Sequence, residues 1–373
     1  MIYFDNAATA LPKAPQVGGA MAWAVEHLGN PGRSFAQPGM LAAREIFAAR
    51  EAVARLVGCP DPARVAFTSG ATESMNLLCR LLGPEDHIIA TENEHNAVLR
   101  PLYQSGCSLD ILPCDGAGNL RLEALPRLLR PNTRMVFANH GSNVTGNLTD
   151  AKALYSLCRE AGALLVLDVA QSLGEAPVDI SLGDVLCFSG HKGLMGPMGT
   201  GGLVLRPGLE LPVLKTGGTG FDAFAPLQRA DMPDLAEAGT PNVPGIYGLL
   251  KAAEFVEEIG LPTLTGHQEK LTRAFYEGVA AVPRVRVCGD FTRWPRLPVV
   301  SLSLEGMDSA EAALALWERF QIAVRPGSHC APLLHRRLEA EGTGLVRFSF
   351  GWHNTLEEVR LGLEAIDQVA SGG

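Results

Sequence analysis

The chain has 373 residues with a mean hydropathy of +0.12, and 47% of them are hydrophobic. This composition is typical of a globular protein with one large, well-buried domain and room for a smaller one. The formal charge of −9 gives no support for nucleic-acid or acidic-membrane binding, and no apolar run approaches the length of a membrane-spanning helix.

Short apolar runs alternate with helix-like stretches through the first part of the chain. Strands are expected at residues 64–68, 87–91, 108–113, 135–139, 164–168, 185–189 and 202–205. Helices are expected at residues 72–82, 96–106, 122–129 and 150–161. Strands separated by helices predict an α/β fold with a mainly parallel, seven-stranded sheet covered on both faces. Right-handed crossovers then bring the carboxyl ends of the strands to one edge, where ligands bind.

The later part of the chain changes character. A Gly/Pro-rich segment at residues 215–245 breaks the pattern, and a long helical segment runs from about residue 246 to 282. A half-buried antiparallel strand at 299–304, a helix at 309–320, a strand at 346–349 and a closing helix at 355–369 predict a smaller α+β domain. We expect a large domain at residues 16–255 and a small domain formed by residues 1–15 and 256–373.

A carboxylate and a lysine follow two consecutive predicted strands. Asp168 ends the run Ala-Leu-Leu-Val-Leu-Asp, and Lys192 lies in Phe-Ser-Gly-His-Lys-Gly after the next strand. Enzymes that use pyridoxal phosphate (PLP) need this pair, because the lysine forms the Schiff base and the carboxylate keeps the pyridine nitrogen protonated. The alternative is that Asp168 caps a strand and Lys192 is solvated, since both are common in loops.

The segment Thr-Ser-Gly-Ala-Thr-Glu-Ser at residues 68–74 runs from a predicted strand into a predicted helix. Backbone N–H groups and small hydroxyl residues at a helix start form an anion site. A capping arrangement, with Ser69 or Thr72 as the cap and Glu73 in the first turn, is an alternative that is compatible with it. The chain contains no GxxxxGK[ST] motif, which excludes a P-loop, and its glycine clusters at 199–202 and 217–220 are not GxGxxG fingerprints.

His95 follows a predicted strand and precedes a predicted helix. A histidine there could stack on a cofactor ring or move a proton. A surface or capping histidine is the more common alternative.

Cys330 differs from the other seven cysteines in its surroundings. It lies in Val-Arg-Pro-Gly-Ser-His-Cys-Ala-Pro, and a loop with Arg325 and His329 nearby makes a thiolate available. Arg325 also suits a substrate carboxylate. The alternatives are a buried structural cysteine and a zinc site from His329, Cys330 and His335, whose spacing is not a standard one. We expect no metal.

The other cysteines and the N-terminus bear on the compartment. No two cysteines have CxxC spacing, and the first residues show neither the basic region nor the apolar region of a signal peptide. We therefore expect a cytoplasmic protein with reduced thiols.

Taken together in chain order, these segments resemble the class V, fold-type I PLP enzymes, and among them the cysteine desulfurases. The likeness runs from residues 4–9 to residues 354–359. Nine segments between these ends match in family order: residues 30–32, 68–73, 92–95, 142–146, 168–171, 189–192, 238–242, 325–330 and 347–349. The loop before the last strand resembles that of the second, shorter-looped group of desulfurases.

The resemblance implies how PLP would be held. Lys192 would bind the cofactor covalently, Asp168 would pair with the pyridinium nitrogen, and Gln171 would contact the ring oxygen. His95 would stack on the ring face. Phosphate contacts would come from Ala71, Thr72, Ser189 and His191 and, across a homodimer interface, from Thr240.

The resemblance also implies how the substrate would react. Asn143 and Arg347 would hold the substrate carboxylate. Cys330 would attack the substrate sulfur, which leaves L-alanine and a persulfide on Cys330. An acceptor protein would then take the sulfur.

Two positions depart from the family pattern. Ser328 stands where the shorter-looped group has the first histidine of His-His-Cys, and residues 34–37 read Ser-Phe-Ala-Gln where many relatives carry a histidine. These departures bear on the substrate rather than on the fold or the cofactor.

Several activities remain open at this point. The leading interpretation is a desulfurase acting on L-cysteine, and a lyase acting on L-selenocysteine is a close alternative. An aminotransferase would use the same lysine and aspartate but has no need for Cys330 and its loop. A non-enzymatic sulfur or PLP carrier would have no use for the full set of Lys192, Asp168, His95, Cys330 and Arg347.

Overall fold

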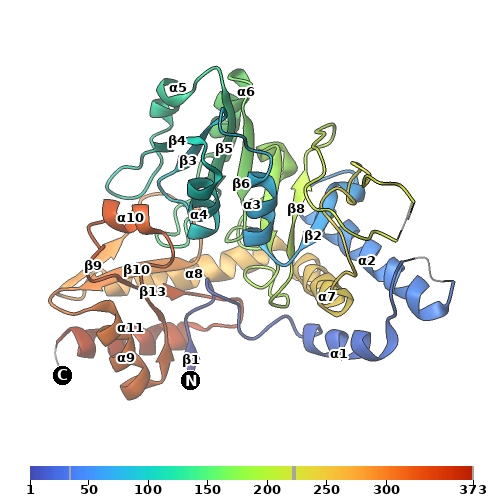
Figure 1. Cartoon of the computed structure of the whole chain (residues 1–373). Helices are drawn as coiled ribbons and strands as arrows, with labels where there is room; N and C mark the ends of the chain where they lie inside the picture. Colours follow the sequence, from blue (N-terminus) through green and yellow to red (C-terminus); the bar gives the residue numbers. More distant parts are fainter. Residues whose placement is uncertain (33–34, 221–223, 372–373) are drawn as a thin grey trace.

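The computed structural model describes residues 1–32, 35–220 and 224–371. At its centre lies a seven-stranded sheet with the strand order β2-β8-β7-β6-β5-β3-β4 (Figure 1). The strands are β2 (Val65–Thr68), β3 (His87–Thr91), β4 (Ser108–Leu112), β5 (Thr133–Asn139), β6 (Leu164–Asp168), β7 (Val185–Ser189) and β8 (Gly201–Leu205). Neighbours from β4 to β7 pair in parallel, and β8 is antiparallel to both β7 and β2. The expected mainly parallel, seven-stranded sheet is confirmed.

Helices cover both faces of this sheet because its strands are apolar on both sides. On β5, Met135 and Phe137 pack on the face covered by α3 (Ala71–Cys79) and α4 (Asn96–Ser105). Val136 and Ala138 face the opposite way, as the period-2 alternation of a strand requires. That face is covered by α2 (Gln37–Leu56), α6 (Ala151–Glu160) and α7 (Val243–Ile259). Helix α1 (Val17–His27) packs on α7.

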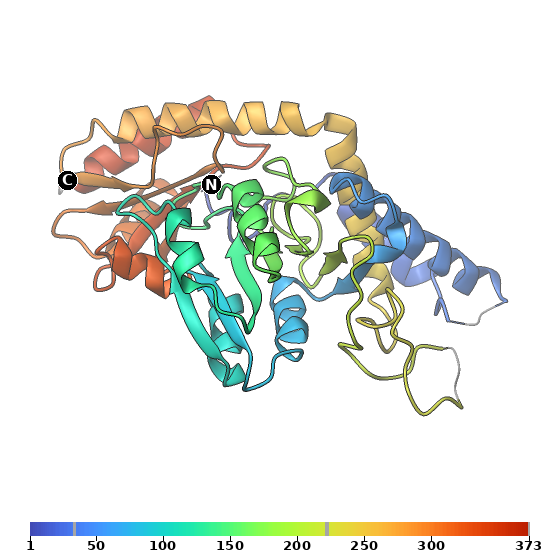
Figure 2. The ribbon, with the colours of Figure 1, turned by 90° about the horizontal axis from the view of Figure 1, so that it is seen from above.

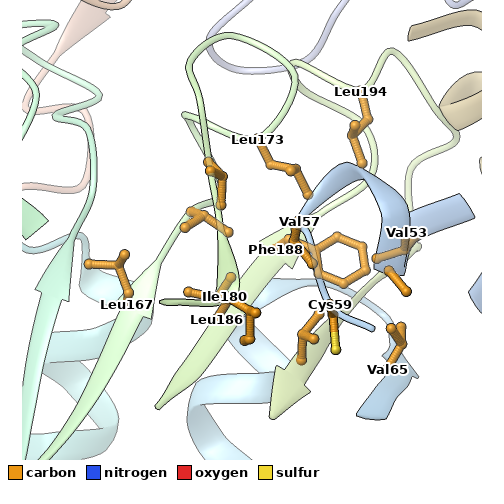
Figure 3. Close-up of a cluster of buried hydrophobic side chains, with 14 of the residues drawn as sticks. Val53, Val57, Cys59, Val65, Leu167, Leu173, Ile180, Leu186, Phe188 and Leu194 are labelled. Atoms are coloured by element: carbon orange, nitrogen blue, oxygen red, sulfur yellow. The ribbon is translucent and has the colours of Figure 1, made fainter. Parts of the chain in front are cut away.

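Figure 3 shows the packing around the end of β7. Phe188, fully buried, lies among Val53 of α2, Val57 directly after that helix and Val65 of β2. Burial of side chains of this size stabilises the fold by roughly 1.5–3 kcal/mol each. The loop that leaves β7 toward Lys192 therefore begins from a rigid point.

The C-terminal part contains a four-stranded antiparallel sheet in the order β12-β13-β10-β9. Its strands are β9 (Val285–Cys288), β10 (Val299–Leu304), β12 (Arg325–Gly327) and β13 (Leu345–Ser349). It packs with α8 (Leu261–Val279), α9 (Ser309–Phe320) and α11 (Leu356–Ala370), while α10 (Pro332–Arg337) follows the Cys330 loop.

The N-terminus joins this part of the molecule. Strand β1 (Ile2–Tyr3) pairs in parallel with β11 (Ile322–Ala323), and Phe4 is buried in the C-terminal core beside Phe275, Phe348 and Phe350. Figures 1 and 2 show the N-terminus beside the C-terminal elements. The division at residues 16–255 stays a prediction.

The long helical segment expected at 246–282 is two helices, α7 and α8, which meet at a bend (Figure 2). Gly260 lies between them with φ of 84°, a conformation that favours glycine, and Pro262 stands in the first turn of α8.

Two further expectations differ in detail. Strand β10 is almost fully buried, not half-buried, because both of its faces are covered. Val300 and Leu302 face the helices of the C-terminal part. Val299 and Ser301 face the loops of the large sheet. The helix expected at 122–129 divides into η2 (Leu122–Ala124) and α5 (Leu125–Leu128). The remaining short turns are η1 (Pro62–Arg64) and η3 (Ile180–Leu182). No helix among the described residues has the length and apolarity needed to cross a bilayer.

Candidate active site

A cavity of about 330 Å³ lies at the carboxyl edge of the large sheet, between the ends of β5, β6 and β7 and the Cys330 loop. Its size is in the range of small-molecule sites. Every site residue expected from the sequence lines it except Thr240: Ala71, Thr72, His95, Asn143, Asp168, Gln171, Ser189, His191, Lys192, Arg325, Cys330 and Arg347. Thr240 is exposed beside a separate hollow of about 1340 Å³, which Thr68 and Ser69 also line.

Asp168 and Lys192 reach the cavity from the ends of neighbouring parallel strands. Asp168 is the last residue of β6, and its Oδ1 accepts the backbone N–H of Ala170 at 2.8 Å. Burial raises the pKa of Asp168, and the nearby Lys192 opposes that shift. Burial lowers the pKa of Lys192, while Asp168 opposes it. Burial therefore disfavours the charged form of each group, while the charge of each favours the charged form of the other.

Lys192 also borders a second, much smaller chamber of about 10 Å³, roughly the space of one water molecule. Glu175 and Gln268 line this chamber with it. Burial raises the pKa of Glu175 to about 8, although Lys192 opposes the shift. Lys192 therefore stands between the main cavity and a buried carboxyl group.

The beginning of α3 forms an anion cradle. The residue before the helix is Gly70, with φ of 146°, and it supplies no side-chain cap to the helix N–H groups. Ser189 Oγ accepts the N–H of Ala71 at 3.2 Å. His191 Nδ1, which is buried, has no hydrogen-bond partner among the described residues. The alternative in which Ser69 or Thr72 caps the helix is wrong, because no described side chain caps it. Glu73 does lie in the first turn, as that alternative expected, and its carboxylate accepts the Ser69 N–H at 2.7 Å.

His95 is both a helix cap and a wall of the cavity. Its Nδ1 accepts the backbone N–H of Ala97 at 3.0 Å at the start of α4, so its proton sits on Nε2. Burial, and next the charge of Lys192, lowers the pKa of His95 to about 4. The ring is therefore neutral near pH 7. The capping interpretation is confirmed, and the same residue lines the cavity.

Two arginines at the cavity share one carboxylate. Arg347 of β13 is buried, and its Nη2 pairs with Asp5 Oδ1 at 3.0 Å while Nη1 donates to the carbonyl of Asn143 at 3.0 Å. Arg325 Nη2 pairs with Asp5 Oδ2 at 2.8 Å and is half exposed. The Nε of Arg347 has no partner among the described residues. The guanidinium of Arg347, a residue that lines the cavity, therefore keeps one N–H without a partner in the described part of the chain.

The loop before α10 presents Cys330 to the solvent and the cavity. The other seven cysteines are buried or partly buried. Burial raises the pKa of Cys59, Cys79, Cys158 and Cys288, for Cys79 and Cys158 to about 12. Among the described residues, Cys330 is the one cysteine that is exposed and lines the cavity, so it is the best placed nucleophile.

The backbone of this loop is unusual. His329 and Cys330 have φ of 49° and 55°, the left-handed region that non-glycine residues avoid. The carbonyl of His329 accepts from Asn143 Nδ2 at 2.8 Å, and the carbonyl of Cys330 accepts from the N–H of Asn96 at 2.7 Å. Asn143 thus holds the loop as well as lining the cavity.

Several site residues were not expected from the sequence. Ala7, Ala8 and Asn139 line the cavity, and Ala7 accepts a hydrogen bond from Gln171 Nε2 at 3.0 Å. Asp5 contributes a carboxylate that pairs with both arginines, and Glu175 contributes a buried carboxyl group beside Lys192. The sequence feature that could have indicated Asp5 and Ala7 as site residues is the segment of residues 4–9, where the family likeness begins. Of the two departures, Ser328 contributes its carbonyl to the N–H of Ala331 at 3.0 Å, and Ser34 lies outside the described residues.

Comparison with known proteins agrees with this geometry. Residues 2–361 match the aminotransferase class-V family. A probable cysteine desulfurase of Pyrococcus abyssi is 31% identical over 99% of this chain and 94% of its own length. One of Mycolicibacterium paratuberculosis is 34% identical over the whole chain, which spans only 56% of that longer relative. The structure of the cysteine desulfurase of Thermococcus onnurineus NA1 superposes with a TM-score of 0.89 at 29% identity, covering 100% of this chain and 95% of that one.

Proposed function

The chain belongs to the aminotransferase class-V family, and on that premise we propose that it is a PLP-dependent cysteine desulfurase. It would convert L-cysteine to L-alanine and carry the sulfur on Cys330 to an acceptor protein. One observation supports this most directly: Cys330, an exposed thiol on a loop, lines the same cavity as Lys192 and Asp168.

The cavity offers a protein group for the aldehyde, the ring nitrogen and the phosphate of PLP. The amine of Lys192 is positioned to bind its aldehyde, and the buried carboxylate of Asp168 suits a protonated ring nitrogen. The uncapped start of α3, with Ser189 and the unpartnered His191 Nδ1, suits a phosphate dianion. Thr72 and Gln171 line the same cavity. When bound, PLP supplies an electron sink for bond cleavage next to the substrate's α-carbon.

The protein's own side chains would orient the substrate. The guanidinium of Arg347 has an unpartnered Nε, and Arg325 reaches the cavity from the loop, so that a substrate carboxylate would meet two positive charges. Asn143 adds a side-chain amide at the same wall. His95, neutral with its proton on Nε2, can stack on a flat ring and donate a hydrogen bond from its edge.

Cys330 would complete the reaction. Its thiolate attacks the substrate sulfur, the carbon–sulfur bond breaks, and a sulfur–sulfur bond forms on Cys330. A proton is returned to the carbon, so that L-cysteine and the thiol become L-alanine and a persulfide without any outside oxidant. The exposed loop then offers the sulfur to an acceptor.

An assay of two substrates tests this proposal. L-cysteine and L-selenocysteine are compared for alanine formation and for sulfide or selenide release, with and without a thiol acceptor. Wild type is compared with Cys330→Ser and with Cys107→Ser as the matched control. We expect Cys330→Ser alone to lose sulfur release from cysteine, and mass mapping to find one added sulfur on the Cys330 peptide.

Other outcomes would lead to other functions. Turnover of selenocysteine alone would indicate a selenocysteine lyase, and amino-group exchange with a keto acid that survives Cys330→Ser would indicate an aminotransferase. A Lys192→Ala variant that keeps a yellow, borohydride-sensitive cofactor would disprove the PLP attachment.

We also propose a homodimer in the cytoplasm. The hollow beside Thr240 is lined by the exposed apolar side chains Phe47 and Leu227, and exposed apolar surface of this kind is common at interfaces. Thr240 would reach the phosphate site of the second subunit. Sedimentation should give twice the chain mass of 39.6 kDa, whereas an active species at that mass would reject the dimer.

A further inference from the structure

Two histidine side chains lie in contact beneath Cys330. His329 Nδ1 is 3.2 Å from His335 Nε2, and both rings are buried, with exposed fractions of 8% and 1%. His329 Nε2 is 3.0 Å from the carbonyl of Arg325 on β12, and His335 lies on α10. The histidine pair therefore bridges the two ends of the loop that carries Cys330.

The partners determine where the protons lie. A carbonyl can only accept, so the contact with Arg325 requires the proton of His329 on Nε2. The Nδ1 of a neutral His329 is then an acceptor, and Nε2 of His335 must be the donor between the rings. His335 Nδ1 carries no proton in this form. It lies 3.1 Å from the carbonyl of Ala331, which already accepts the backbone N–H of His335.

The opposite tautomer of His335 fits worse. With the proton on Nδ1, His335 would donate to the carbonyl of Ala331, but two buried ring nitrogens, Nδ1 of His329 and Nε2 of His335, would face each other with no hydrogen between them. With the proton on Nε2, one buried ring nitrogen, Nδ1 of His335, lacks a donor among the described residues, and the Ala331 carbonyl that it faces keeps the backbone N–H of His335. A charged pair is also disfavoured, because burial and the charge of Arg347 lower the pKa of His329, to about 3, and of His335. The relay therefore runs from His335 to His329 and on to the carbonyl of Arg325.

This relay holds a strained backbone. His329 and Cys330 are consecutive left-handed residues without glycine, a conformation that costs of order 1–3 kcal/mol each and persists only where the surroundings impose it. Asn143 and Asn96 hold the two carbonyls. The side chain of His329 is held at both ring nitrogens, by the hydrogen bond from His335 and by the one to the carbonyl of Arg325.

We propose that His335 is a positioning residue, which through His329 keeps Cys330 in the left-handed conformation facing the cavity. The inference rests on the proposed function, in which Cys330 receives the substrate sulfur. His335 itself touches neither cofactor nor substrate in this assignment.

Three variants of the complete, PLP-loaded protein test it. His335→Leu removes the donor, and His335→Gln keeps an N–H at a similar reach. His87→Leu is the matched control, because His87 is also fully buried and hydrogen-bonded, to Thr133 Oγ1 at 2.7 Å, but stands at the start of β3, the end opposite the cavity. Hydrogen–deuterium exchange of residues 326–334 is measured along with kcat and KM.

We expect His335→Leu to exchange about fivefold faster in this segment, the ratio that corresponds to one net hydrogen bond of ~1 kcal/mol. Its kcat should fall by up to about fivefold while KM for cysteine stays unchanged. His335→Gln should restore both quantities, and His87→Leu should change neither exchange at 326–334 nor kcat.

The proposal is overturned if His335→Leu leaves loop exchange and kcat at wild-type values, or if Gln fails to rescue them. A measurement on wild type covers the case in which the leucine variant does not fold: ¹⁵N NMR of labelled histidines should show both rings neutral with the proton on Nε2, and a His335 proton on Nδ1 would reject the relay. Sulfur release that survives Cys330→Ser would instead refute the proposed function while leaving the exchange result intact.

Discussion

Ser189 Oγ accepts the backbone N–H of Ala71 at 3.2 Å, and this contact joins the end of β7 to the beginning of α3. The strand that leads to Lys192 and the helix that would bind a phosphate are thus fixed to one another. Lysine attachment and phosphate binding are therefore set by the same local geometry.

Ser189→Ala should weaken retention of PLP. The hydroxyl lies at the anion cradle, and a hydrogen bond to a charged group contributes about 1.5–3 kcal/mol, so the dissociation constant should rise about tenfold or more. Absorbance titration of the apoprotein measures it. Ser156→Ala, on the exposed face of α6, is the control and should bind as wild type does.

Asp168→Asn should keep the fold and lose the activity. The amide can still accept the N–H of Ala170 through its oxygen, but it has no charge to hold a proton on the ring nitrogen. We expect turnover to fall on the order of a hundredfold or more at full PLP occupancy. Normal turnover under that condition would show that another group serves the ring nitrogen.

Asp5→Asn should destabilise the protein. Asp5 neutralises Arg347, which is buried, together with Arg325. Removing one partner of a buried ion pair typically costs about 3–5 kcal/mol, because the other charge is left uncompensated. Denaturant unfolding of the apoprotein measures the loss. Glu357→Gln breaks the exposed pair with Arg360 and should leave the midpoint unchanged.

Glu175→Gln should change how stability depends on pH. In the folded protein the pKa of Glu175 is about 8, whereas the ordinary value is 4.5. Between these values the folded state binds one proton more than the unfolded state, so wild type loses stability as the pH rises. Glutamine has no such proton.

The measurement is the difference in unfolding free energy between this variant and wild type. The unfolding free energy of the variant minus that of wild type should increase by about 1.4 kcal/mol per pH unit from about pH 5 to pH 8 and be constant at lower pH. A difference that stays flat across the whole range would mean that Glu175 is ionised in the fold.

Much of the central sheet could be predicted because its strands are short apolar runs closed by polar residues. β3, β6 and β7 have the bounds expected from the sequence. Asp168 and Lys192 were found for the same reason, since parallel neighbours place their carboxyl ends together. The helices α1 and α2 were not predicted individually, because no strand pattern brackets them.

The remaining differences have physical causes. In the sequence, Gly260 can be taken for an ordinary glycine inside one long helix. Its positive φ, which ends α7 before α8 begins, becomes visible in the structure. Asp5 was not predicted as a partner of Arg347, because nothing local to either residue indicates the pair. His335 precedes Arg336 and Arg337, and a run of cationic residues predicts a solvent-exposed helix face. The ring of His335 is nevertheless buried, so nothing in the sequence indicated its contact with His329. Thr240 depends on a second subunit, so its role stays a prediction.

The ion pair between Asp5 and Arg347 spans 342 positions of the chain. At a synthesis rate of ~5–20 residues per second, Asp5 leaves the ribosome on the order of 20–70 seconds before its partner. The central sheet can form during that time, but β1 and Asp5 must wait for β11, β12 and β13. The site would thus be completed late in synthesis. A nascent chain would already contain Lys192 and the phosphate cradle at the start of α3 before Arg347 was available to bind a substrate carboxylate.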